Sequence, residues 1–258
     1  MLQIIPVEAF TDNYIWLIHN GSAAIVVDPG DAQPVLEQLR ALRLDLQGIL
    51  ITHHHTDHTG GIAALAAQLK GPIYAPCPTA ITHTIQPDPR TSFQLLGIDW
   101  KVLAVPGHTQ DHVAYWGLSP NHPKPMLFCG DTLFSVGCGR LLQGTAPQLY
   151  QSLQLLEQLP PETEIYCAHE YTIANIRFAL AADPNNFELQ QYLEHCLSLR
   201  VQNRPTLPST LAKEKAINPF LRCTQPDIIH SALANGATCT EPLQIFSTLR
   251  QWKNHFQS

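Results

Sequence analysis

Thr52-His53-His54-His55-Thr56-Asp57-His58 follows directly on the apolar run Ile49-Leu50-Ile51, which predicts a buried strand. Residues two apart in an extended chain face the same side. His53 and His55 can therefore present two imidazoles to a single metal ion.

The second half of this motif predicts a further ligand pair. Asp57 and His58 are adjacent where the chain turns into a helix start at Gly60-Gly61, so both can reach a second ion. His54 should face the opposite way, and we expect it to make a structural hydrogen bond. A histidine-rich run can also be an expression tag, but this run lies inside the chain against a buried strand, which favours metal binding.

Three more apolar runs end at a residue type that binds metals. The runs span residues 102–107, 126–130 and 165–168 and are followed by His108, Asp131 and His169. Sites in open α/β sheets assemble at the carboxyl ends of the strands. We therefore expect seven ligands to converge: His53, His55, Asp57, His58, His108, Asp131 and His169. His112 is expected to support a ligand rather than to bind a metal itself.

The predicted secondary structure changes near residue 170. Residues 1–170 alternate short apolar runs with helical patterns, which predicts an α/β catalytic domain, and residues 171–258 predict a smaller helical, substrate-binding domain. We expect strands over residues 2–7, 14–19, 23–27, 48–51, 100–105, 112–116, 126–129 and 164–168, the first three pairing antiparallel. We expect helices over residues 33–42, 61–69, 146–159, 173–182, 187–200 and 241–255.

Composition excludes several classes of protein. The 258 residues are 45% apolar with a net charge of −6, so no basic surface is available to neutralise nucleic acid. No apolar run reaches about eighteen residues and the N-terminus lacks a basic, apolar leader, so we expect a cytoplasmic protein that contacts no membrane. The seven cysteines show no C-x-x-C spacing, which favours free thiols.

The motifs carry a family resemblance. THHHTDH, GHTQDH, CGD and AHEY resemble the metallo-β-lactamase superfamily, which implies a four-layered αβ/βα sandwich. FTDNY with Tyr14, GCGR at 137–140, CAHEYT at 167–172, PSTL at 208–211, NPFLR at 218–222 and the terminal LRQWK extend the similarity. Over nearly its whole length the chain resembles the glyoxalase II (hydroxyacylglutathione hydrolase) family.

This resemblance implies roles for the predicted ligands. His53, His55 and His108 would bind one divalent ion, Asp57, His58 and His169 would bind the other, and Asp131 would bridge both. Zinc is the expected metal, with iron or manganese as alternatives. The resemblance also implies glutathione contacts by Arg140, Tyr171, Arg250 and Lys253. Leu142 departs from the family, which often has an aromatic residue at that position.

Two ions sharing a bridging water lower its pKa, so a metal-bound hydroxide is the expected nucleophile on a thioester carbonyl. Asp57 is a candidate for orienting that hydroxide. The thiolate leaving group needs little help from an acid. The expected reaction converts an S-(2-hydroxyacyl)glutathione, chiefly S-D-lactoylglutathione, to glutathione and D-lactate, the second step of methylglyoxal detoxification, in a monomer.

Recognition of anionic glutathione requires a local cationic patch. Residues 1–170 hold seven basic and fifteen acidic side chains, whereas residues 171–258 hold eight and six. Arg250 and Lys253 are three apart on a predicted helix and share a face. A solvated helix end that is favoured by the helix dipole is the alternative interpretation of this pair.

Four other functions fit less well. A glutathione persulfide dioxygenase with one iron would keep the ligands but usually lacks the helical tail. A nuclease of the superfamily needs a basic groove. An interaction module without turnover normally loses some ligands, and a secreted β-lactamase needs a signal peptide.

Overall fold

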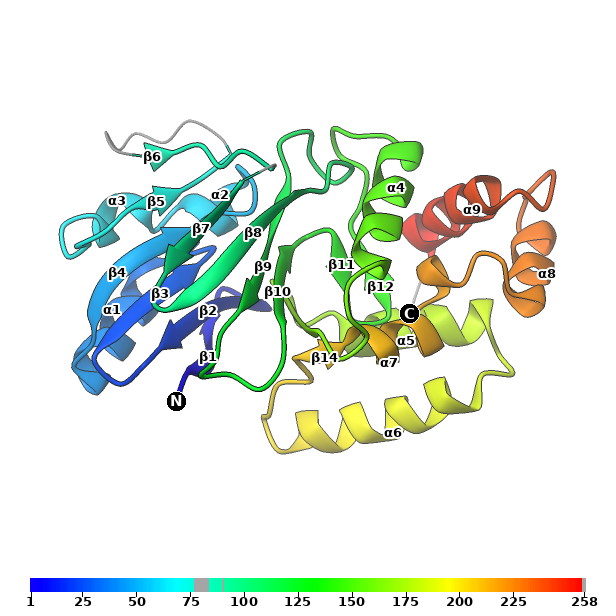
Figure 1. Ribbon diagram of the computed structural model, residues 1–258. Coiled ribbons are helices and arrows are strands. Elements are labelled where there is room, and N and C mark those ends of the chain that lie inside the picture. The colour runs from blue at the N-terminus through cyan, green and yellow to red at the C-terminus, as the bar shows by residue number, and fades with distance from the viewer. Residues whose placement is uncertain (77–83, 90, 257–258) are drawn as a thin grey trace. The chain divides into compact units, whose positions relative to one another are not determined.

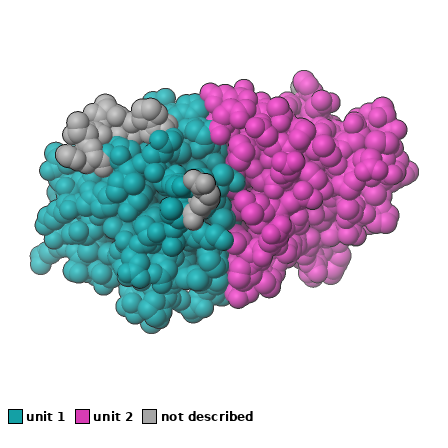
Figure 2. All heavy atoms as spheres, turned by 45° about the horizontal axis from the view of Figure 1, so that its top comes forward, with its two compact units in different colours: residues 1–104, 111–130, 166–169 teal, residues 105–110, 131–165, 170–258 magenta. Residues whose placement is uncertain are grey.

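The computed structural model describes residues 1–76, 84–89 and 91–256, which form two compact units (Figure 2). Unit 1 comprises residues 1–104, 111–130 and 166–169, and unit 2 comprises residues 105–110, 131–165 and 170–258. The predicted division near residue 170 stays a prediction. None of the described helices combines the length and apolar character that crossing a bilayer requires.

Unit 1 contains a six-stranded sheet (Figure 1). Its strands in spatial order are β1 (Gln3–Ala9), β2 (Asn13–His19), β3 (Ala23–Val27), β4 (Asp45–Leu50), β5 (Ile73–Tyr74) and β6 (Thr84–Ile85). β1 with β2 and β2 with β3 are antiparallel, which confirms the predicted pairing. The pairs from β3 to β6 are parallel.

A second sheet in unit 1 confirms four more predicted strands. Its strands in spatial order are β7 (Ser92–Leu95), β8 (Ile98–Ala104), β9 (Val113–Leu118), β10 (Met126–Gly130) and β13 (Glu164–Cys167). β7 to β10 pair antiparallel. The first residues of β13 belong to unit 2, where they pair with β14 (Ser209–Thr210). The short strands β5, β6, β7 and β14 were not predicted, because runs of two to four residues carry little periodic signal.

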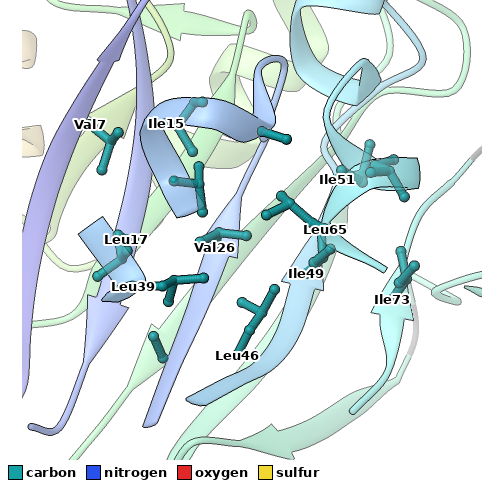
Figure 3. Close-up of a cluster of buried hydrophobic side chains, with 14 of the residues drawn as sticks. Val7, Ile15, Leu17, Val26, Leu39, Leu46, Ile49, Ile51, Leu65 and Ile73 are labelled. Carbon is teal, nitrogen blue, oxygen red and sulfur yellow. The ribbon is translucent and has the colours of Figure 1, made fainter. Parts of the chain in front are cut away.

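The core of unit 1 lies between the first sheet and the helices beside it (Figure 3). Leu17, Val26 and Ile49 from three neighbouring strands pack in one cluster with Leu39 of α1 (Ala32–Leu42). Burial of each aliphatic side chain of this kind contributes about 1.5–3 kcal/mol to the free energy of folding. This cluster fixes the end of β4, where the histidine motif begins.

The helix predicted over residues 61–69 is wrong in extent. Two short helices, α2 (Thr56–Thr59) and α3 (Ile62–Leu65), take its place. Gly61 donates its N–H to the Pro29 carbonyl at 2.8 Å, and a Cβ at Gly61 would lie 2.6 Å from that oxygen. After Leu65 the backbone continues in turns, and the Lys70 N–H donates to the Leu46 carbonyl at 2.8 Å, which draws the chain back to β4.

Unit 2 is mainly helical. Its helices are α4 (Ala146–Glu157), α5 (Thr172–Ala182), α6 (Phe187–Val201), α7 (Leu211–Ile217), the 3-10 turn η1 (Pro219–Leu221), α8 (Pro226–Ala234) and α9 (Pro242–His255), and it holds the hairpin β11 (Leu133–Phe134) and β12 (Gly137–Cys138). The predictions for α1, α4, α5, α6 and α9 are confirmed. The structure therefore combines α/β sheets with a C-terminal helical region, as expected.

The described part of the chain holds six cysteines. No disulfide links any two of them, and Cys239 is exposed while the other five are buried. Cys77 lies outside the described residues.

Glu214 of α7 is a fully buried carboxyl group in unit 2. Its Oε2 accepts the Val136 N–H at 2.7 Å and an Asn218 side-chain N–H at 3.0 Å. Burial raises the pKa of Glu214, and the hydrogen bonds to this carboxyl oppose that rise. The carboxyl fixes the turn between β11 and β12.

The raised pKa of Glu214 predicts a pH-dependent stability. A carboxyl whose folded pKa lies above its unfolded value stabilises the fold at low pH, and that contribution is lost as pH rises through the folded pKa. Glu214→Gln keeps an acceptor oxygen without a charge. As pH rises from about 5 to about 8, the free energy of unfolding measured with urea should therefore fall for the parent relative to Glu214→Gln. Exposed Glu194→Gln is the control, and equal pH profiles for parent and Glu214→Gln would contradict the assignment.

Candidate metal centre and substrate pocket

The loop after β4 is held from both sides in unit 1. The Ile51 N–H donates to the Tyr74 carbonyl at 2.8 Å, and the Tyr115 hydroxyl of β9 donates to the Ile51 carbonyl at 2.9 Å. The Val113 N–H donates to the Thr52 carbonyl at 2.9 Å. Both sheets of unit 1 thus fix the backbone from which the histidines project.

His53 and His55 point to one place. Nε2 of His53 lies 2.9 Å from Nδ1 of His55, and the His53 side chain is fully buried. The buried His112 ring stacks on His53 with 4.5 Å between ring centroids. His54 makes the structural hydrogen bond predicted for it, with its Nδ1 2.9 Å from an oxygen of Asp111.

A second cluster in unit 1 joins Asp57, His58 and His169. Each offers one ligand atom, and these atoms lie within 4.8 Å of one another. Oδ2 of Asp57 is 3.5 Å from Nε2 of His58 and 3.6 Å from Nε2 of His169. Two imidazoles and a carboxylate at this spacing match the donor set that Zn²⁺ and similar ions take. The residues therefore fit a divalent metal.

Carboxylate acceptors behind these histidines select one tautomer. Nδ1 of His58 lies 3.0 Å from Oδ2 of Asp28, and Nδ1 of His169 lies 2.8 Å from Oδ1 of Asp12. A carboxylate accepts the Nδ1–H and leaves Nε2 as the ligand atom. The Asn13 side-chain N–H also donates to Oδ2 of Asp57 at 3.1 Å, which orients that carboxylate.

Asp28 uses both of its oxygens. Oδ1 accepts the Thr52 N–H and Oδ2 accepts the Thr52 hydroxyl, each at 2.7 Å. Because the hydroxyl donates to Asp28, its oxygen can accept the Nδ1–H of His53, which lies 3.0 Å away. Asp28 therefore orients His58 directly and His53 through Thr52.

Unit 2 brings together the other two predicted ligands. His108 Nδ1–H donates to the Arg140 carbonyl at 2.8 Å, and His108 Nε2 lies 3.5 Å from Oδ2 of Asp131. Gly139 lies between these groups, because a Cβ there would stand 2.0 Å from the Asp131 carbonyl oxygen. Only glycine permits this approach.

A cavity of about 410 Å³ lies within unit 2 beside this pair. All four residues expected to contact glutathione line it: Arg140, Tyr171, Arg250 and Lys253. His108 and Asp131 line it too, as do the aromatic rings of Phe134, Phe178 and Phe256. Cationic side chains, aromatic surface and candidate metal ligands therefore border one cavity.

The two basic residues of α9 differ in their surroundings. Arg250 is almost fully buried, and its Nη1 donates to the Cys138 carbonyl at 2.8 Å. The Lys253 ammonium donates to the Asn175 side-chain oxygen and lies 5.1 Å from the centre of the Phe178 ring. Burial lowers the pKa of Lys253 to about 7, and the charge of Arg250 adds to this effect.

The remaining predicted positions are at or near the surface. Tyr171 is partly exposed and packs edge-on against Phe134, with 5.2 Å between centroids. Arg140 supplies its carbonyl to His108 and its side chain to the cavity. Leu142, where the family often has an aromatic residue, is 60% exposed.

Sequence reasoning missed the groups behind the ligands. Asp12 and Asp28 are isolated acidic residues in turns after β1 and β3, and only the strand-end position of Asp28 in VVDPGD marks it. Asn175 and Phe178 lie one and two turns along a helix whose N-terminal residue is Thr172, on the side that lines the cavity. Helical spacing from Tyr171 could have indicated both.

Comparison with known families covers nearly the whole chain. Residues 10–79 and 78–169 match the metallo-β-lactamase superfamily. Residues 170–256 match the family described as hydroxyacylglutathione hydrolase C-terminus.

Individual relatives match from end to end. The hydroxyacylglutathione hydrolase of Nitrosomonas europaea is 49% identical over 261 residues, which is 100% of this chain and 97% of the relative. That of Vibrio parahaemolyticus is 48% identical over 262 residues, covering 99% of this chain and 100% of the relative.

Solved structures share the fold. ETHE1 from Myxococcus xanthus has a TM-score of 0.62 at 23% identity, covering 98% of both chains. The BLEG-1 B3 metallo-β-lactamase has a TM-score of 0.61 at 22% identity, covering 86% of this chain and 99% of that one. TTHA1623, solved in a di-iron-bound form, has a TM-score of 0.50 at 29% identity over 64% of this chain and 91% of its own.

Asp28→Asn tests the tautomer argument. An amide cannot accept from the Thr52 N–H, the Thr52 hydroxyl and His58 in the same way, so both His53 and His58 lose their fixed tautomer. Removing partners of this kind costs about 10–100-fold in metal affinity. Zinc content after dialysis against a graded chelator should fall accordingly, whereas Asp111→Asn, which contacts His54, should retain metal. Parent-like zinc affinity in a folded Asp28→Asn protein would refute the argument.

Proposed function

Because this chain belongs to the hydroxyacylglutathione hydrolase family of the metallo-β-lactamase superfamily, we propose that it hydrolyses S-(2-hydroxyacyl)glutathione, chiefly S-D-lactoylglutathione, to glutathione and D-lactate. The protein is a thioester hydrolase with the metallo-β-lactamase fold. One observation supports this choice of substrate. The cavity of unit 2 is bordered by His108 and Asp131 together with the cations Arg140, Arg250 and Lys253.

We propose that seven side chains hold two divalent ions, with zinc first and iron or manganese as alternatives. One ion falls to His53, His55 and His108, the other falls to Asp57, His58 and His169, and Asp131 serves both. The cluster of Asp57, His58 and His169 and the acceptors behind the histidines support this set. The di-iron form of the related TTHA1623 keeps iron among the candidates. Bound ions of this kind polarise a carbonyl and lower the pKa of water.

The chain's own residues prepare the site for that chemistry. The acceptors at Asp12, Asp28 and the Arg140 carbonyl engage Nδ1 of three histidines, so Nε2 of each is the nitrogen that is available to a metal. Asn13 holds the Asp57 carboxylate, the candidate for orienting the attacking group. Groups that are oriented before the substrate binds provide electrostatic preorganisation.

The cavity supplies recognition and accepts the product. Glutathione carries two carboxylates and one ammonium, and in a net acidic protein its binding depends on local cations. Arg140, Lys253, Tyr171 and Phe134 line the cavity, which supports contacts of the two cations with a carboxylate and of the two rings with the peptide. The departing thiolate enters a positively charged cavity, so no dedicated acid is required.

We propose that the sequence divides in function near residue 170. Residues 171–258 contribute Tyr171, Arg250 and Lys253 to substrate binding, and the hydroxyacylglutathione hydrolase C-terminus match begins at residue 170. The predicted monomeric state and cytoplasmic location stand as further parts of this proposal.

A thioester assay tests the proposed function. The metal-loaded protein should release free thiol from S-D-lactoylglutathione without consuming oxygen. Oxygen uptake with glutathione persulfide and no thioester cleavage would instead identify a dioxygenase. Asp131→Ala should abolish thiol release and lower metal content. A fully active Asp131→Ala protein with full metal content would show that the ligand set is wrong.

Lys253 predicts a pH dependence of substrate binding. With a pKa of about 7, its ammonium is charged below neutrality and neutral above it, so anionic substrate binds better at low pH. KM should rise roughly tenfold from about pH 6.5 to about pH 8, with a smaller change in kcat. Lys253→Arg stays charged throughout and should flatten this rise. An unchanged pH profile of KM in Lys253→Arg would contradict the role of Lys253.

A further inference from the structure

Arg250 is buried in unit 2 and is tied to the backbone. Its Nη1 donates to the Cys138 carbonyl at 2.8 Å and approaches the Gly139 carbonyl at 3.4 Å. Its Nη2 donates to the Asn254 side-chain oxygen at 3.1 Å, and the guanidinium carbon lies 5.3 Å from the centre of the Phe220 ring. Most of the donors of this side chain are therefore committed within the protein.

The segment that Arg250 holds also adjoins both candidate ligands of unit 2. The next carbonyl along, that of Arg140, accepts the Nδ1–H of His108 at 2.8 Å. The Gly139 N–H donates to the Thr132 carbonyl at 3.1 Å, directly after Asp131. A Cβ at Gly139 would stand 3.2 Å from the His108 Cβ. Three consecutive carbonyls thus connect Arg250 on one side to His108 on the other.

The geometry of a guanidinium suits this task. Its planar fork can donate to two successive carbonyls and to Asn254 at once. A lysine ammonium at the same position would keep the charge, but one nitrogen cannot span the separate acceptors. A contact that served only to attract an anion would depend on the charge and not on the fork.

We propose that Arg250 is a positioning residue for the metal ligands His108 and Asp131, acting through the segment Cys138–Arg140; this rests on the proposed function of the site. By fixing two carbonyls of this segment, Arg250 aims the third at Nδ1 of His108, and Nε2 is left facing Asp131. The substrate-binding helix α9 thereby also determines metal affinity.

Arg250→Lys is the variant that separates the two roles. We expect Co²⁺, used as a probe, to bind about 10–100-fold more weakly in competition with a chelator, because the support of His108 is lost. The visible absorption of the bound Co²⁺ should also change. Lys253→Met is the matched control on the same helix face, and it should bind Co²⁺ like the parent while KM rises.

Asn254→Ala covers the case in which Arg250→Lys does not fold. Asn254 is exposed and accepts a hydrogen bond from Nη2 of Arg250, so the variant should fold and weaken Co²⁺ binding by a smaller factor. In metal-free protein, hydrogen exchange at the Gly139 amide should also quicken.

Parent-like Co²⁺ affinity and absorption in both folded Arg250→Lys and Asn254→Ala would overturn the proposal, and a raised KM alone would reduce Arg250 to an anion contact. Failure of the parent to cleave S-D-lactoylglutathione would refute the proposed function, but it would leave the Co²⁺ comparison intact. The two ideas therefore fail separately.

Discussion

The protonation of Nδ1 is the constraint on which the candidate site depends. Each of three histidines places Nδ1 against a fixed acceptor: Asp28 for His58, Asp12 for His169 and the Arg140 carbonyl for His108. A neutral imidazole has one donor and one acceptor nitrogen, so fixing the donor also fixes the ligand atom. The acceptors come from the ends of strands and from the connections that follow them.

Two charged side chains near the candidate ligands are buried. Asp28 and Arg250 are both nearly inaccessible to water, and an unpaired charge there would be costly. Asp28 accepts hydrogen bonds from Thr52 and His58, and the two terminal nitrogens of Arg250 donate to backbone carbonyls and to Asn254. The hydrogen bonds that compensate the buried Asp28 charge therefore also orient a candidate ligand, His58.

The sequence predicted those features that are local in the chain. The spacing of His53 and His55 and the strand-end rule for His108, Asp131 and His169 depend on only a few neighbouring residues. The long periodic helices and the apolar strands are confirmed for the same reason. Asp12 and Asp28 escaped prediction because they meet their histidines across separations of 157 and 30 residues. No periodicity links such positions.

Other failures have the same origin. The helix expected over residues 61–69 ends at Leu65, where the backbone continues in turns with the hydrogen bonds Gln68 N–H to Leu65 and Leu69 N–H to Ala66, which composition does not encode. The shared face of Arg250 and Lys253 follows from helical spacing, but the partners of Arg250 are backbone carbonyls on a distant hairpin. Side-chain pattern alone carries no information about such acceptors.

The cavity proposed to bind the anionic substrate combines two kinds of cation. Arginine stays charged at every physiological pH, so Arg140 and Arg250 maintain a positive potential that does not titrate. Burial lowers the pKa of Lys253 to about 7, and the charges of Arg250 and Arg140 add to this effect. A fixed charge and a titratable one therefore border the same cavity.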